Sequence, residues 1–314
     1  MGEINSSVGE LMSRRIGRLV TIGSFDGVHL GHMALLDRTV AEAKKRRLTS
    51  LALTFNIPPR MILDRNKKIS VLSNPIEKEK LIKSRGIDEI VQLDFDRGFS
   101  KIKPYAFFRG VLLERFKAKG IVVGLDFRFG VNRSAGAVEL VRWGEEMRIP
   151  VWVIPPVKLR REVVSSTTIR ELLLKDNLNH ANQLLGHPYL IHGSVVKGHG
   201  KGKKLGYPTT NLKTSRGKVL PQGVFVVRGT AVGGSERPLL GVCNIGRRPT
   251  FYRRSSIVVE PHWLGSSFKK TPKAMFIELL TRLRGEKKFK SPSELIQAIR
   301  TDIKRARSFT GAPQ

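Results

Sequence analysis

The pattern of apolar residues changes once along this chain of 314 residues, at Gly186-His187-Pro188, and the change predicts two domains of different class. Before it, apolar runs of strand length alternate with segments of helical spacing. These runs are Leu19–Gly23, Ser50–Phe55, Glu89–Phe95, Gly120–Val123 and Val151–Ile154. Such alternation predicts a doubly wound, Rossmann-like α/β sheet, in which ligands bind at the carboxyl ends of the strands.

Beyond residue 186 the runs are short, rich in Val, Ile and Phe, and separated by turn signals, which predicts an all-β domain. They are Tyr189–Val196, Gly223–Val232, Leu239–Ile245, Ile257–His262 and Ala274–Leu283. Ser291-Pro292-Ser293-Glu294 then combines a capping serine, a first-turn proline and a carboxylate, which predicts a helix to about Arg307. We therefore expect an α/β domain over residues 15–185 and a small barrel with a C-terminal helix over residues 186–310.

Composition narrows the classes of protein that need to be considered. Lysine and arginine number 57 against 26 acidic residues, a net charge of +31, and so basic a surface attracts nucleic acid, phosphorylated ligands or acidic membranes. The single cysteine, Cys243, cannot form an intramolecular disulfide, and no apolar stretch has the length of a membrane span. We expect a cytoplasmic protein without a membrane partner, and the oligomeric state stays open.

A motif with two histidines directly follows the first expected strand and opens the first helix. His29 and His32 are three residues apart, so they can lie on one face of a helical turn. Gly31 between them lets a ligand approach the backbone, and the free N–H groups of a helix start attract phosphate. The segment predicts a triphosphate cradle with two potential proton donors, and the alternative is a pair of surface histidines without a role.

Three segments together resemble a known enzyme family. The H-x-G-H signature after a first strand is typical of the nucleotidyltransferase superfamily, whose members transfer AMP from ATP. Val123-Gly124-Leu125-Asp126-Phe127-Arg128-Phe129-Gly130 and Val164-Ser165-Ser166-Thr167-Thr168-Ile169-Arg170 resemble motifs of the bacterial bifunctional riboflavin kinase/FAD synthetases. The resemblance implies an in-line attack of the FMN phosphate on the α-phosphorus of ATP, which releases pyrophosphate without a covalent enzyme intermediate. Residues 15–185 would thus be the FMN adenylyltransferase domain.

The resemblance also implies roles for individual residues of this domain. His29, His32 and Arg170 would be catalytic and neutralise phosphate charge, and Mg²⁺ would bridge phosphate oxygens. The nucleotide and flavin would contact Gly23, Ser24, Phe25, Asp26, Gly31, Asp126, Phe127, Ser165, Ser166 and Thr167. The last three precede an apolar helical run, so their hydroxyl and N–H groups can hold phosphate oxygens; a plain helix cap is the alternative.

Two positions of this domain depart from the family's pattern. Ser24 stands where the family usually has asparagine, and Pro58 stands where a Pro-His-Pro turn would place histidine. When one polar contact is lost from a site that is otherwise complete, the transfer of AMP is usually weakened and not abolished. An enzyme with only one active site is therefore an alternative.

The expected barrel opens with a glycine-rich loop that carries four lysines, Lys197 to Lys204. Such a loop can wrap phosphate through its N–H groups, although lysine-glycine runs are equally common in solvated or RNA-binding turns. Pro208-Thr209-Thr210-Asn211 resembles the P-T-x-N motif of riboflavin kinases, and residues 244–251 and 259–262 resemble two further segments of that domain. Residues 186–310 would accordingly be the riboflavin kinase domain.

In that domain the resemblance implies that Glu260 is the general base for the ribityl 5′-hydroxyl as it attacks the γ-phosphate of ATP; a surface carboxylate is the alternative. Thr209 and Asn211 would hold Mg²⁺. Nucleotide contacts would come from Gly198, Gly200, Gly202, Lys203, Pro208, Asn244 and Arg248. The segment 263–273 is basic and lacks the acidic and tyrosine residues that the family commonly has there.

The function implied is the synthesis of FMN and FAD, with riboflavin, FMN and ATP as small-molecule substrates. A rival class is a nucleic-acid-binding derivative of the same scaffold, which the net charge would suit. The cluster Lys44–Arg47 ends an expected helix, where cations favour the helix dipole without a partner, and no aromatic-interleaved RNA motif is present. A nucleic-acid partner is therefore not favoured.

Overall fold

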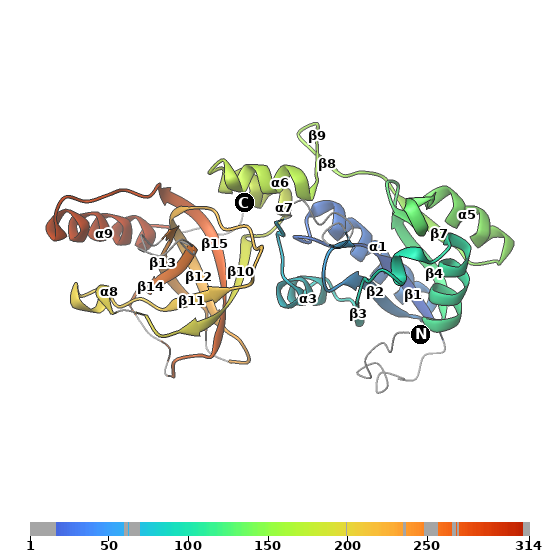
Figure 1. The fold of residues 1–314 in the computed structure, drawn as a ribbon, viewed down its shortest axis with the longest axis horizontal. Helices are drawn as coiled ribbons and strands as arrows, with labels where there is room; N and C mark the ends of the chain where they lie inside the picture. Colours follow the sequence, from blue (N-terminus) through green and yellow to red (C-terminus); the bar gives the residue numbers. More distant parts are fainter. Residues whose placement is uncertain are drawn as a thin grey trace. The chain divides into compact units, whose positions relative to one another are not determined.

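The computed structural model describes residues 17–59, 62, 70–198, 200–234, 237–247, 257–265, 268 and 270–309. The chain divides into two compact units, described in turn below (Figure 1). One unit comprises Met1–Ile69 and Lys78–Ser165, and the other comprises Ser70–Glu77 and Ser166–Gln314. Contacts thus assign the segment Ser70–Glu77 and all residues after Ser165 to the barrel unit, whereas the sequence pattern places the domain boundary at residue 186.

The first unit is built on a five-stranded parallel sheet in the order β3-β2-β1-β4-β7, which confirms the predicted α/β class. Its strands are β1 (Arg18–Ile22), β2 (Thr49–Phe55), β3 (Glu89–Leu93), β4 (Ala118–Gly124) and β7 (Val151–Ile154). Alternate residues of β1 enter different cores, Leu19 on one face and Val20 and Ile22 on the other. Burial on both faces explains why these strands read as continuous apolar runs.

Helices cover this sheet, and one of them differs from expectation. They include α1 (Leu30–Arg46), α4 (Pro104–Ala106) and α5 (Ala137–Glu146), whereas α3 (Pro75–Lys83) begins in the segment assigned to the other unit and belongs to this one from Lys78 onward. The apolar spacing of Pro104–Lys117 predicts a continuous helix, whereas the structure has a short α-helical turn there followed by a π-helix, η3 (Phe107–Arg115). Smaller elements are η2 (Phe99–Lys101), β5 (Arg128–Phe129), η4 (Val131–Arg133), β6 (Ala135–Gly136), β8 (Lys158–Leu159) and β9 (Glu162–Val163). No helix of the described ranges has the length and apolarity needed to cross a membrane.

The second unit contains a closed barrel in the order β10-β11-β14-β13-β12-β15, which confirms the predicted all-β domain. Its elements are α6 (Ser166–Leu174), α7 (Leu178–Leu185), β10 (Tyr189–Val196), α8 (Lys201–Lys204), β11 (Asn211–Thr214), β12 (Gly223–Ala231), β13 (Leu239–Arg247), β14 (Ile257–Trp263), β15 (Ala274–Arg284) and α9 (Pro292–Arg307). The Ser291 hydroxyl caps α9 by accepting the N–H of Glu294 at 3.2 Å, as its sequence predicts. Ala306 of α9 packs against Val224 and Val242 of the barrel.

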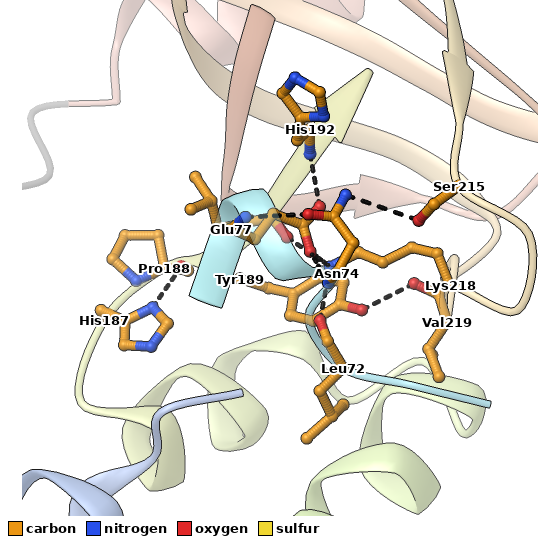
Figure 2. Close-up of polar contacts among 11 residues, drawn as sticks. Leu72, Asn74, Glu77, His187, Pro188, Tyr189, His192, Ser215, Lys218 and Val219 are labelled. Atoms are coloured by element: carbon orange, nitrogen blue, oxygen red, sulfur yellow. Dashed lines mark hydrogen bonds and ion pairs between the residues drawn. The ribbon is translucent and has the colours of Figure 1, made fainter. Parts of the chain in front are cut away.

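A buried ion pair attaches the segment Ser70–Glu77 to the barrel (Figure 2). The side chains of Glu77 and Lys218 are both fully buried, with 2.8 Å between carboxylate and ammonium. The Glu77 carboxylate also accepts the backbone N–H groups of Asn74 and His192. The Lys218 ammonium donates to two backbone carbonyls, Leu72 and Leu190, and lies over the ring of Tyr189 at 4.2 Å. These extra partners offset the cost of removing two charges from water.

Candidate active sites

The turn between β1 and α1 has a conformation that buried side chains fix. Phe25 and Val28 both adopt positive φ angles of 45° and are fully buried in the core between α1 and the sheet. A positive φ is unusual for such residues and persists only where the surrounding packing holds it, which is typical of functional turns. The turn carries Gly23, Ser24 and Asp26 from the end of β1 to the start of α1.

The two histidines of the motif lie together, as their spacing predicts. Their rings stack with centroids 3.7 Å apart, and the edge of Phe25 meets His32 at 5.3 Å. His29 is the N-cap of α1, because its Nδ1 accepts the backbone N–H of His32 at 3.3 Å. A neutral His29 ring therefore carries its proton on Nε2. A side chain at Gly31 would press on the His29 ring, since its Cβ would lie 3.2 Å from Cε1.

His32 differs electrostatically from a solvent-exposed histidine. Burial, and then the neighbouring His29 and Lys78, hold its pKa well below the ordinary value of 6.5. At neutral pH its ring is uncharged and can donate one N–H hydrogen bond. Within the described part of the chain, the buried Nδ1 of His32 has no hydrogen-bond partner. A buried ring nitrogen without a partner is unusual in a folded protein, and a bound ligand or water would satisfy it.

Asp126 and Phe127 follow β4, the strand next to β1 in the sheet. Asp126 is exposed, and the Phe127 ring stacks on Phe129 at 5.4 Å. The strand order reverses between β1 and β4, and the carboxyl ends of parallel strands at such a reversal form the usual ligand crevice. The sheet therefore brings Asp126 and Phe127 to the same edge as the β1–α1 turn.

Sequence reasoning missed Lys78 of α3, which reaches this edge from inside the unit. Its ammonium donates to the Phe55 carbonyl at 2.7 Å and to the Thr54 hydroxyl at 3.3 Å. Burial lowers its pKa to about 8, and nearby Asp26 opposes the shift. In the sequence PIEKEKLIK it reads as one of several solvated lysines on a charged helix, so no local signal marks it.

The remaining residues predicted for this site divide between the two units. Ser165 ends the sheet unit, whereas Ser166, Thr167 and Arg170 belong to α6 of the barrel unit. Thr167 is exposed, and Ser166 and Arg170 are partly buried. Their contact with a phosphate held by α1 stays a prediction.

The barrel unit holds a pocket of about 360 Å³ that brings several predicted residues together. Glu260 on β14 pairs in register with Asn244 on β13, and both line the pocket with Thr209 and Gly202. Further lining residues, which sequence reasoning missed as site residues, are Leu205, Tyr207, Val224, Val242, His262, Arg284, Glu286, Lys287, Phe289, Leu295, Ile299, Asp302 and Ile303. Most of these additional lining residues come from α9 and the segment directly before it. The sequence pattern of α9 predicts only a helix that covers the barrel.

Three hydrogen-bond contacts, one of them between backbone groups, hold the Pro208–Asn211 segment against β14. The Pro208 carbonyl lies 2.8 Å from Nδ1 of His262, and the Thr210 N–H donates to the Pro261 carbonyl at 2.9 Å. The Thr210 hydroxyl accepts the indole N–H of Trp263 at 3.1 Å. These contacts place Thr209 beside the strand that carries Glu260.

The glycine-rich loop approaches this segment closely. A side chain at Gly198 would collide with the amide of Asn211, and one at Gly202 would collide with the Tyr207 carbonyl. Gly200 has a φ of 70°, in the left-handed region that favours glycine.

Of the residues predicted for the kinase site, five are absent from the pocket lining and a sixth lies outside the part of the chain that the structure describes. Asn211 is buried at the start of β11, while Lys203 and Pro208 are exposed in the flanking loop. Gly198 and Gly200 belong to the same loop and are likewise not among the lining residues. The sixth, Arg248, lies outside the described residues.

A pair of histidines at the start of a helix, at the switch point of a parallel sheet, together with a carboxylate-bearing barrel pocket, is the arrangement expected of a two-domain, nucleotide-dependent transferase. The FAD synthetase family model matches residues 12–168, and the riboflavin kinase family model matches residues 185–310. The bifunctional riboflavin kinase/FMN adenylyltransferase of Escherichia coli strain K12 is 34% identical over 297 residues, which cover 94% of this chain and 93% of that protein. The chain belongs to this family of bifunctional riboflavin kinases/FMN adenylyltransferases.

Two further relatives extend the comparison. The protein of the same name from Listeria monocytogenes is 28% identical over 296 residues, which cover 94% of this chain and 93% of that protein. A crystal structure titled as a macrolide-efflux protein from Streptococcus pneumoniae has a TM-score of 0.82 at 28% identity and covers 94% of this chain and 95% of that chain. The whole fold, with both domains, is therefore shared with a solved structure.

Proposed function

We propose that the barrel pocket phosphorylates riboflavin to FMN with ATP, and that the edge of the parallel sheet adenylylates FMN to FAD. The observation that carries the proposal is the convergence of Glu260, Asn244 and Thr209 on one pocket of the barrel. In the sheet unit, the stacked His29 and His32 at the start of α1 support the second reaction. ATP, Mg²⁺ and a cytoplasmic location belong to the same proposal.

In the kinase reaction Glu260 takes the proton of the ribityl 5′-hydroxyl. The oxygen forms a bond to the γ-phosphorus of ATP as the bond to the leaving ADP oxygen breaks. The apolar part of the lining, with Val224, Val242 and Phe289, suits an aromatic ring system. Gly202 and Thr209 at the other part of the lining suit phosphate.

The donor chemistry of this pocket fits Mg²⁺ bound together with a nucleotide. The Thr209 hydroxyl in the pocket lining and the Asn211 amide, at the start of β11 outside that lining, would supply oxygen ligands, which Mg²⁺ prefers. In the described ranges no three His, Cys, Asp or Glu residues are grouped to hold a metal by themselves. Phosphate oxygens and water would complete the shell, and the ion would neutralise charge on the transferred phosphoryl group.

In the adenylyl transfer an FMN phosphate oxygen attacks the α-phosphorus of ATP, and the bond to pyrophosphate breaks. The attacking phosphate is already anionic, so no general base is needed. The site must instead hold two anions in line and stabilise the charge that develops on the phosphate oxygens. A neutral His32 does this as an N–H donor. Backbone N–H groups at the start of α1 act in the same way.

The test is to incubate the purified protein with riboflavin, ATP and Mg²⁺ and to follow FMN and FAD by chromatography. The wild type is expected to form both products. A His29→Asn/His32→Asn double variant is expected to stop at FMN. Formation of neither product, combined with tight, salt-sensitive RNA binding, would support the basic nucleic-acid-binding scaffold instead.

Ser24 and Pro58 motivate a second candidate, an enzyme with one active site. Parallel reactions fed with riboflavin or with FMN distinguish the two cases. FMN from riboflavin without FAD from either substrate would assign the chain to kinase activity alone. FAD from FMN without FMN from riboflavin would assign it to adenylyl transfer alone.

A further inference from the structure

Among its described residues, the parallel-sheet unit buries a single lysine, Lys78 of α3, whose exposed fraction is 2%. A buried ammonium costs free energy unless it is paired and hydrogen-bonded, and methionine would fill a similar space without that cost. The charge at this position therefore calls for a reason beyond packing.

Hydrogen bonds of the Lys78 ammonium connect two strands at their carboxyl ends. It donates to the Phe55 carbonyl, where β2 ends, and to the Thr54 hydroxyl. The Thr54 hydroxyl in turn donates to the Ser24 carbonyl at 3.2 Å. Ser24 belongs to the turn that leads from β1 to the histidine pair, so the chain of hydrogen bonds from Lys78 ends on that turn.

Electrostatic interactions join the same ammonium to the other ionisable groups of the turn. Asp26, which is 3% exposed, raises the pKa of Lys78 against the effect of burial. Burial, then His29 and then Lys78 lower the pKa of His32. The Lys78 charge thus balances Asp26 and disfavours a second positive charge on His32.

We propose that Lys78 is a positioning residue for adenylyl transfer, which holds the β1–α1 turn, and with it the histidine pair, on β2. The inference rests on the adenylyltransferase activity proposed above and extends it to a residue outside the family motifs that the sequence displays. Because the ammonium is buried, it acts through Thr54, Asp26 and His32 and does not touch substrate.

The proposal has a signature in the pH dependence of the reaction. Lys78 loses its proton as the pH rises through about 8. Asp26 then loses its counterion and Thr54 loses a charged donor, so the turn is held less firmly. FAD formation from FMN should fall across this range, whereas the kinase reaction in the barrel unit does not depend on Lys78.

The experiment compares Lys78→Gln and Lys78→Arg with the wild type from about pH 6 to about pH 10. A matched control is Lys83→Gln, which removes an exposed lysine of the same helix. In each preparation, kcat and KM are measured for FAD formation from FMN, kinase activity reports the integrity of the barrel unit, and thermal melting reports the folding of the sheet unit. Lys78→Gln should lower kcat for FAD formation about 100-fold, the scale of a misplaced reacting group. Lys78→Arg should retain more activity and lack the fall near pH 8, because a guanidinium stays charged.

A second measurement does not depend on turnover. The pKa of His32, followed by NMR in the full-length protein, should rise in Lys78→Gln and stay unchanged in Lys83→Gln. The proposal is overturned if Lys78→Gln keeps the wild-type kcat and alkaline limb, or if the His32 pKa does not move. A wild type that forms FMN but no FAD would overturn the adenylyltransferase proposal, and the His32 titration would still decide the role of Lys78.

Discussion

Burial gives His32 a defined effect on stability as well as a role in the site. Burial holds the pKa of His32 in the folded protein well below 6.5, its ordinary value in the unfolded chain. At a pH between the folded and the unfolded pKa, the unfolded chain therefore binds a proton that the folded chain does not. The contribution of His32 to the free energy of unfolding is therefore fully present above pH 6.5, and it declines as the pH falls below that value. His32→Gln should make thermal melting of the sheet unit less sensitive to acid, measured at neutral pH and near pH 5. His180→Gln, a change in α7 of the other unit, should not; equal acid sensitivity in both variants would contradict the assignment.

Glu260 permits a second prediction at the scale of one residue. Glu260→Gln keeps the size of the side chain and removes the base, so FMN formation should fall about 10²- to 10⁴-fold, the usual contribution of general base catalysis. FAD formation from added FMN should continue, because that site lies in the other unit. Glu278→Gln, on β15 and outside the pocket lining, is the control. Comparable losses of FMN formation in both variants would show that Glu260 has no special role.

At the scale of elements, the addition of a single methyl group to the glycine-rich loop should weaken the binding of ATP. Gly198→Ala would drive the loop away from the Asn211 amide, with which its Cβ would collide. We expect a raised KM for ATP in the kinase reaction, measured at several Mg²⁺ concentrations. Gly110→Ala, in the π-helix η3 of the other unit where an added Cβ meets no atom within 4 Å, should leave this KM unchanged. An unaltered KM for ATP in Gly198→Ala would show that the loop does not contribute to the nucleotide site.

Elements with strong local signals could be predicted from the sequence, and those defined by distant contacts could not. Helix α9 carries its own capping serine, and β1 shows an apolar run because both of its faces are buried. Strand β11 is only four residues long, three of them polar, and it is defined by its pairing with β10 and β14. The π-helix differs from an α-helix only in its hydrogen-bond register, which the spacing of apolar residues near Phe107 does not reveal.

The same distinction holds for the sites. Position directly after a strand predicts His29 and His32 as site residues, and the P-T-x-N pattern predicts Thr209. Lys78 was missed because its partners Thr54 and Phe55 lie more than twenty positions away in the chain. The assignment of Ser70–Glu77 to the barrel unit was missed for the same reason, since Glu77 and Lys218 are 141 positions apart.

At the scale of the whole molecule, the barrel unit should depend on a segment from the first quarter of the chain. Glu77→Ala leaves the buried Lys218 without its carboxylate, a change that typically costs about 3–5 kcal/mol. We expect kinase activity to be lost at a lower temperature in this variant, measured by activity after brief heating and by calorimetry. Glu77→Leu/Lys218→Met, which removes both charges, should recover part of the loss. Wild-type heat resistance of Glu77→Ala would show that the ion pair contributes little.

The separation of Glu77 from Lys218 along the chain also affects the order of events during synthesis. Glu77 leaves the ribosome long before Lys218, and at about 5–20 residues per second the 141 positions between them take roughly 7 to 30 seconds to translate. The parallel-sheet strands up to β7 are complete within this interval. The nascent chain must therefore keep a carboxylate hydrated at the end of an early segment until the last third of the protein arrives to enclose it.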